Sequence, residues 1–254
     1  ISSAKSTQQI YLASQAFWSQ LNQAIYVATP VAQTQALAIQ HALQGNRPVQ
    51  TARITDAIIA QRLYSAILAL SQTTSYNCND TEYPEYQLVF QAKSQLIPAV
   101  LSQKCNTISL SGAYKSRSGL YTMTTQFKQL FTQTLAGATF ASAQPDQLMQ
   151  TLESNSISSH GQVKDTRLMQ QLYARIFTLP VSIIGSGCPP NSDKINGKAR
   201  WYSLDFTQWG LPIMSLTVYE GSCKLVQPAP GINQGQTLLG DATFWDLVQR
   251  ATSA

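Results

Sequence analysis

The sequence predicts a mainly α-helical protein: a helical bundle over residues 1–179, then a small disulfide-stapled α+β region with a short antiparallel sheet over residues 180–254. Three observations lead to this expectation. Apolar residues recur every three or four positions through the first two-thirds of the chain, they alternate after residue 180, and four cysteines lie two in each region. At 254 residues and 44% hydrophobic content, the chain can bury a sizeable core.

The first helix is predicted over residues 10–28. Its apolar residues Ile10, Phe17, Leu21 and Ile25 fall on one face, and Pro30 ends it. The same periodicity predicts helices over residues 36–43, 53–70 and 85–103, the last shortened or kinked by Pro98.

Three more helices complete the predicted bundle, over residues 120–135, 145–152 and 164–177. Pro145 suits the first position of the middle one. The segments 71–84 and 155–161 are rich in Ser, Thr and Asn and are predicted loops, while residues 108–119 are a loop or a short strand.

The pattern changes after Pro180. Residues 201–206 and 213–219 alternate between apolar and polar, which is typical of half-buried strands, and residues 223–226 are a candidate third strand. Asp241 is placed to cap a last helix that carries Phe244 and Leu247.

Charge is scarce in this sequence. Charged residues make up 11% of it, against about 25% in an average soluble domain. Low charge weakens self-repulsion and favours a protein that lives in an assembly, although a composition habit of the source organism explains it equally well. The net charge is +5, but Lys and Arg are scattered, so no nucleic-acid partner is expected.

No apolar stretch is long enough for a membrane span, so a membrane-protein partner is the expected route to any membrane association. The chain starts at Ile1 without Met, which we interpret as a processed chain or a fragment.

The four cysteines are Cys78, Cys105, Cys188 and Cys223. Local pairing, Cys78 with Cys105 and Cys188 with Cys223, is preferred among the three possible pairings because each pair brackets one supersecondary unit. Two disulfides imply an oxidising compartment, hence a periplasmic or secreted protein. A zinc site would need closer ligand spacing, and four buried free thiols in a cytosolic protein are the remaining alternative.

No motif assigns catalytic, cofactor-binding or metal-binding residues. A nucleotide-binding glycine loop, a G-x-S-x-G elbow and an H-E-x-x-H helix are all missing from the sequence. The two histidines, His41 and His160, could join one of many serines in a spatially assembled triad, and Asp205 and Glu220 could meet across the predicted strands.

The segment 76–86 combines acidic residues with Tyr76, Tyr83 and Tyr86. It is either a presented recognition loop that binds a partner or a stapled connection whose tyrosines cover the bundle.

The chain is rich in Gln, Ser and Thr and is predicted to carry disulfides. With these features, its segments 7–18 and 76–86 resemble periplasmic components of the Dot/Icm type IV secretion system. The similarity is to IcmX-like proteins, with the periplasmic region of DotA-type proteins as the alternative. It implies a non-enzymatic, ring-forming part of a translocation channel that contacts other secretion-apparatus proteins and serves virulence.

The leading functional hypothesis is therefore a structural component of a bacterial secretion apparatus. Two alternatives stay open. One is a secreted binding module, such as a pilus-tip adhesin or an effector, that uses the segment 76–86. The other is a hydrolase with a spatially assembled triad.

Overall fold

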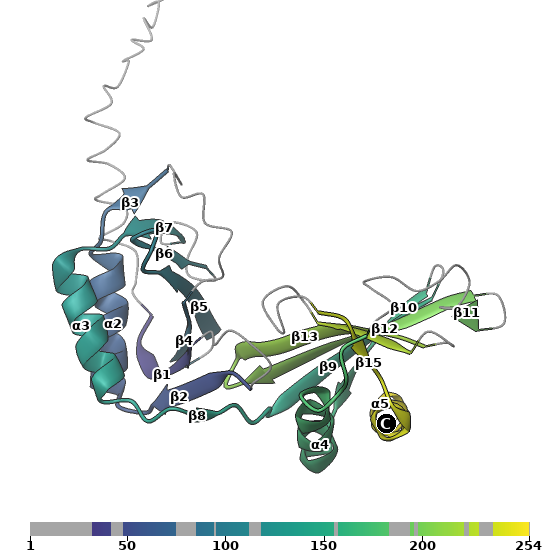
Figure 1. Cartoon of the computed structure of the whole chain (residues 1–254). Helices are drawn as coiled ribbons and strands as arrows, with labels where there is room; N and C mark the ends of the chain where they lie inside the picture. Colours follow the sequence, from purple (N-terminus) through teal and green to yellow (C-terminus); the bar gives the residue numbers. More distant parts are fainter. Residues whose placement is uncertain are drawn as a thin grey trace, which may run out of the picture.

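Two antiparallel β-sheets, each covered on one face by a pair of helices, make up the described part of the computed structural model (Figure 1). The described residues are 32–41, 48–74, 85–93, 95–111, 118–154, 157–182, 194–195, 198–220, 224–228 and 236–253. The predicted helix over residues 10–28 lies outside them.

The first sheet has eight strands in the order β3-β7-β6-β5-β4-β1-β2-β8. Their bounds are β1 Thr34–His41, β2 Gln50–Ile54, β3 Gln72–Thr73, β4 Tyr86–Ala92, β5 Gln95–Ser102, β6 Thr107–Leu110, β7 Gly119–Thr122 and β8 Ala141–Ser142. Helices α2 (Ala57–Leu68) and α3 (Thr125–Ala136) cover one face of this sheet (Figure 1). The core between them includes Tyr64, Phe90 and Phe131.

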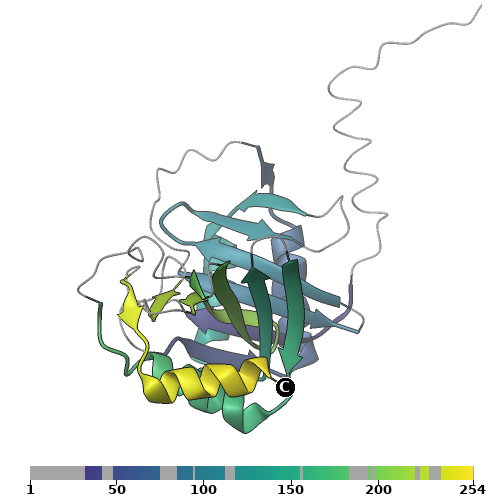
Figure 2. The ribbon, with the colours of Figure 1, turned by 90° about the vertical axis from the view of Figure 1, so that its right-hand side faces the viewer.

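The second sheet runs β10-β9-β12-β13-β14-β15, with β11 paired to β12. Its strands are β9 Gln147–Ser154, β10 Ile157–Val163, β11 Lys194–Ile195, β12 Lys198–Gln208, β13 Leu211–Tyr219, β14 Leu225–Pro228 and β15 Leu238–Leu239. Helices α4 (Thr166–Ile176) and α5 (Ala242–Thr252) lie side by side beneath it (Figures 1 and 2). This sheet thus unites strands from both sides of residue 180.

The tip of the β12–β13 hairpin joins the two sheets. Gln208 is 6% exposed, and its Oε1 accepts hydrogen bonds from Thr51 Oγ1 at 2.9 Å and Gln144 N at 3.1 Å. Beside it, Gln91 Nε2 donates to the Trp209 carbonyl at 3.0 Å. Ala38 and Val89 of the first sheet belong to the same buried cluster as the core of the second. The outer face of one sheet is therefore partly covered by the other.

The predicted mainly helical fold with an N-terminal bundle is wrong. Residues 36–43 belong largely to β1, residues 85–103 form the β4–β5 hairpin, and residues 145–152 enter β9. The predicted loop 155–161 belongs largely to β10. The α+β unit with a short sheet of its own is also corrected: its strands belong to a larger sheet that includes β9 and β10 from before residue 180, and a hydrophobic cluster packs α4 and α5 against that sheet.

The burial of β1 explains why its sequence predicts a helix. Residues 36–40 are all buried, because one face of β1 meets α2 and the other meets the second sheet. A strand buried on both faces loses the two-residue alternation, and alanine at Ala36 and Ala38 then favours a helical prediction.

Pro98 fits in β5 because of the direction of its backbone groups. Its carbonyl accepts a hydrogen bond from Ser111 N at 2.9 Å, on the side of β6. In an antiparallel strand the N–H and C=O of one residue point to the same neighbour. The missing N–H of proline therefore removes no hydrogen bond to β4.

Four predicted helices are confirmed. α2 and α4 fall within the expected segments, α3 begins five residues later and ends one residue later than expected, and α5 follows Asp241. Asp241 caps α5 as predicted, with its Oδ1 accepting from Phe244 N at 2.9 Å. The strands predicted over residues 201–206 and 213–219 lie within β12 and β13.

Candidate functional site

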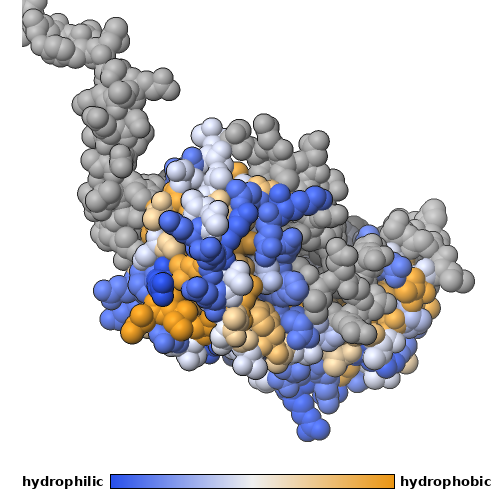
Figure 3. Space-filling model, turned by 60° about the vertical axis from the view of Figure 1, so that its left-hand side comes forward, coloured by the Kyte–Doolittle hydropathy of each residue, from blue (hydrophilic) through white to orange (hydrophobic). Residues whose placement is uncertain are grey.

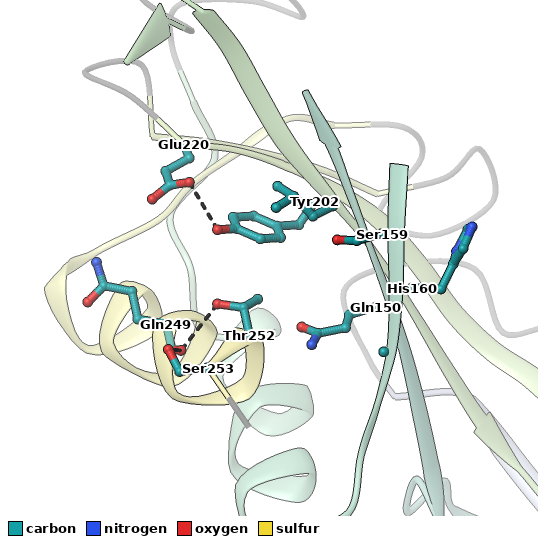
Figure 4. Close-up of a pocket in the computed structure, with 10 residues that line it drawn as sticks. Gln150, Ser159, His160, Tyr202, Glu220, Gln249, Thr252 and Ser253 are labelled. Carbon is teal, nitrogen blue, oxygen red and sulfur yellow. Dashed lines mark hydrogen bonds between the residues drawn. The ribbon is translucent and has the colours of Figure 1, made fainter. Parts of the chain in front are cut away.

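A polar pocket of about 320 Å³ lies between the C-terminal end of α5 and the strands β9, β10 and β12 (Figure 4). Most of the side chains that line it carry hydrogen-bonding groups. They include Gln150, Ser159, Tyr202, Glu220, Gln249, Thr252 and Ser253.

Strand register places the floor of the pocket. Gln150 pairs with Gly161 on β10, and Leu152 pairs with Tyr202 on β12, so all lie on the sheet face that α5 covers. A Cβ at Gly161 would approach Gln150 Nε2 to 2.8 Å. The glycine therefore allows the Gln150 side chain to lie across β10.

Tyr202 and Glu220 form one side of the pocket. The Tyr202 hydroxyl donates to Glu220 Oε2 at 3.0 Å, and Tyr202 is only 5% exposed. The rigid phenol sets the position of the carboxylate at the end of β13, as Figure 4 shows.

Hydrogen-bond acceptors converge on this space. Gln150 Oε1 is buried and has no hydrogen-bond partner. The last turn of α5 faces the pocket, and its Gln249 carbonyl accepts from Thr252 Oγ1 at 3.1 Å and Ser253 Oγ at 2.7 Å. A helix C-terminus carries partial negative charge, so the end of α5 brings backbone hydrogen-bond acceptors to this side of the pocket. None of the described residues lining the pocket is Lys or Arg.

The pocket does not bring a serine and a histidine together. Ser159 and His160 are consecutive in β10 and point to opposite faces, and His160 points away from the pocket in Figure 4. His160 Nδ1 instead lies 2.9 Å from Thr151 Oγ1 on the exposed face. Within the described ranges no group of three His, Cys, Asp or Glu residues could hold a metal ion.

Asp205 and Glu220 do not meet. Asp205 pairs with Met149 and Ser215 on the face away from α5, while Glu220 bonds Tyr202 on the pocket side.

Of the three predicted partner-binding tyrosines, Tyr76 and Tyr83 lie outside the described residues. Tyr86 begins β4, where its ring stacks on His41 at 4.8 Å and meets Phe131 edge-on at 5.1 Å. Burial and the neighbouring Glu85 raise the pKa of Tyr86. Tyr86 therefore fastens β4 to β1 and α3.

Cys105 lies in the turn between β5 and β6 and is disulfide-bonded. Cys78, Cys188 and Cys223 lie outside the described residues, so the predicted pairing stays a prediction. Peptide mapping of the oxidised protein would test it.

A second hollow is the α2–β1 groove, an open depression of about 780 Å³ lined by Gln33, Thr34, Ala57, Ile58, Gln61, Arg62 and Ser65. Ile58 is 80% exposed, opposite the buried stripe of α2. Figure 3 turns the helix-covered side toward the viewer and shows apolar surface low on this side.

Hydrogen bonds fix the shape of the α2–β1 groove. Asp56 Oδ1 caps α2 by accepting from Ile58 N at 2.8 Å. Gln61 Oε1 accepts from both the Thr34 N–H at 2.7 Å and the Thr34 hydroxyl at 3.0 Å. The groove is thus a preformed surface between α2 and the start of β1.

Sequence reasoning missed the pocket residues Gln150 and Tyr202. A helix over residues 145–152 would have separated Gln150 from β12. Residues 147–152 do not alternate between apolar and polar, and Leu148 and Leu152 have the four-residue spacing of a helix, so the local sequence did not mark this strand.

No protein-family model matches the chain, and no curated protein or solved structure does either. None of the described helices has the length and apolar character to cross a membrane.

Proposed function

We propose that this protein acts by binding other protein chains, as a non-enzymatic structural component that assembles head-to-tail into a ring. The observation that carries the proposal is the α2–β1 groove with Ile58 at its rim, 80% exposed. Fully burying an isoleucine side chain contributes about 1.5–3 kcal/mol, so covering Ile58 would contribute that much to a contact at the groove.

The occupant that we propose is the segment 10–28 of a neighbouring copy. Its sequence carries one apolar stripe, including Phe17 and Leu21, which suits an apolar groove. The segment ends five residues before Gln33, which itself lines the groove. Each copy thus carries both halves of the contact, and a head-to-tail contact of this kind closes into a ring when the rotation permits.

The low charge of the chain supports the same function, because weak self-repulsion favours assembly. A periplasmic place in a secretion apparatus rests on the sequence resemblance and stays a prediction.

Complementary variants test this contact. Ile58→Glu places a charge in the groove, Phe17→Glu places one on the segment, and Met149→Glu is the control at an exposed apolar residue of the second sheet. We expect analytical ultracentrifugation to find a ring for the wild type and for Met149→Glu, and monomers for each of the other variants alone.

A mixture of the Ile58→Glu and Phe17→Glu copies retains one intact groove and one intact segment. It should form dimers that grow no further. A monomeric wild type, or a ring that survives both substitutions, would refute the proposal.

A further inference from the structure

We propose that the outer edge of β10, the side of the strand away from β9, binds an extended, uncharged segment of another protein. The segment would add to the second sheet as a further antiparallel strand. This edge and the α2–β1 groove belong to different sheets. The proposal therefore concerns a second contact and does not depend on the ring.

β10 differs from the other strands that end the two sheets. No described strand pairs with its outer edge, which runs along seven residues, Ile157–Val163. The strands at the other three sheet ends, β3, β8 and β15, have two residues each. Short edge strands are one way in which proteins prevent pairing with other chains, and β10 does not use it. The end of α5 lies beside this margin of the sheet (Figure 2).

The backbone direction in β10 follows from the pairing of β12 with β9. The Thr207 carbonyl accepts a hydrogen bond from Asp146 N at 3.0 Å, so the backbone groups of Thr207 point toward the β9 side. The pairing of β12 with β9 has no register shift, and the backbone groups along a strand point to alternate neighbours. Ser203, four residues before Thr207, therefore directs its backbone groups to its β9 partner Thr151.

Thr151 thus directs its own backbone groups to β12 and not to β10. Its partner on β10, His160, then points its N–H and C=O away from β9, and the same alternation directs those of Gln162 outward. The backbone groups of Gly161 point to Gln150 on β9 instead. The outer edge of β10 therefore presents donors and acceptors at the spacing of a β-ladder, which an extended polypeptide segment can pair with.

The sequence of β10 contains none of the usual features that block such pairing. Residues 157–163 include no Pro, Asp, Glu, Lys or Arg, and proline and charged side chains are the residues that protect exposed edges. A charged partner segment would find no opposite charge in β10. An uncharged segment therefore suits this edge.

The polar pocket beside β10 favours another protein over a second copy of this chain. Ser159 and Gly161 of β10 line the pocket together with Thr252 and Ser253 of α5, and its volume is about 320 Å³. Two β10 strands paired over their full length would place Ser159 opposite Gly161, and these small residues would leave the pocket open. A partner strand with a larger polar side chain at this position, such as glutamine, would fill it.

The test is an NMR titration of the full chain carrying Ile58→Glu. This substitution leaves β10 unchanged and removes the ring contact proposed above, so the two proposals fail separately. The probe is acetyl-Thr-Val-Thr-Gln-Thr-Val-Thr-amide, and the control is the same peptide with its three central amide nitrogens methylated. With the probe we expect saturable shifts and slower hydrogen exchange at the amides of His160 and Gln162. With the methylated control we expect neither effect.

His160→Pro removes an outward N–H without removing a hydrogen bond to β9, so it should weaken binding of the probe about tenfold or more and leave the protein folded. Gln162→Pro makes the same change two residues further on and replaces the first variant if that one lowers the melting temperature by more than a few degrees. His160→Thr retains the N–H and should bind the probe as before, which separates the backbone from the imidazole.

A peptide of residues 157–163 tests the alternative occupant, and it should bind more weakly than the probe. If it binds more tightly, the edge serves a second copy and the proposal is wrong. The proposal is also overturned if the probe does not bind, if its methylated form binds equally well, or if both proline variants bind the probe as tightly as the parent protein.

Discussion

Replacing Gln208 with methionine should loosen the junction between the two sheets. The two side chains have similar volume, so the substitution leaves the packing nearly unchanged and removes the amide. Gln208 Oε1 is the acceptor for Thr51 Oγ1 at 2.9 Å and for Gln144 N at 3.1 Å, and Thr51 is only 2% exposed.

The expected cost follows mainly from the hydroxyl of Thr51, because Gln144 is exposed and its N–H can bond water. A buried donor that loses its partner costs about 1–3 kcal/mol, so Gln208→Met should lower the free energy of unfolding by about that amount. Thr51→Val removes only one donor and leaves Gln208 bonded to Gln144, so it should cost about 1 kcal/mol.

Urea denaturation of the two single variants and the double variant measures both costs and their coupling. The double variant should be about 1 kcal/mol more stable than the sum of the single effects predicts, because the residues share one hydrogen bond. Gln162→Met, at an exposed position of β10, is the control and should change stability by less than about 0.5 kcal/mol. If Gln208→Met lowered the free energy of unfolding by less than about 0.5 kcal/mol, the conclusion that Gln208 holds the two sheets together would be refuted.

Two further predictions concern the β12–β13 turn and alkaline pH. Gly210 has φ +83°, and a Cβ there would lie 2.5 Å from Leu96 Cδ1, so Gly210→Ala should clearly lower the melting temperature. The control is Gly137→Ala, where the nearest atom to the new Cβ lies at 3.8 Å and the melting temperature should not fall. Equal effects of the two substitutions would contradict the turn geometry. Burial raises the pKa of Tyr173, so its neutral form is favoured in the fold. That stability is present below the unfolded pKa of about 10 and is lost as the pH rises above it; Tyr173→Phe should flatten the fall in unfolding free energy between about pH 10 and pH 12, and an unchanged slope would argue against it.

Local sequence patterns were enough to predict some helices and strands. Asp241 predicted the start of α5 because an N-cap needs only its own side chain and the next turn. The alternation in β12 and β13 predicted strands because one face of each is more buried than the other.

The strands that were predicted as helices were missed because their tertiary neighbours, which the local sequence does not show, decide their structure. β1 is buried on both faces, and Pro98 is tolerated in β5 because its missing N–H lies on the side away from β4. The pocket escaped notice for the same reason: Gln150 and Tyr202 are 52 positions apart and meet only through the pairing of β9 with β12.

The sequence by itself determined the low charge, the helix caps and the four amphipathic helices of the described chain, since each depends on composition or on residues within one or two turns. Only the tertiary structure decided that the remaining segments are strands, that strands from both sides of residue 180 form one sheet, and that Gln208 joins the two sheets. The physical reason is that a strand has no hydrogen bonds of its own: its backbone is satisfied by partners far away in the chain, and these pairings outweigh local helix propensity.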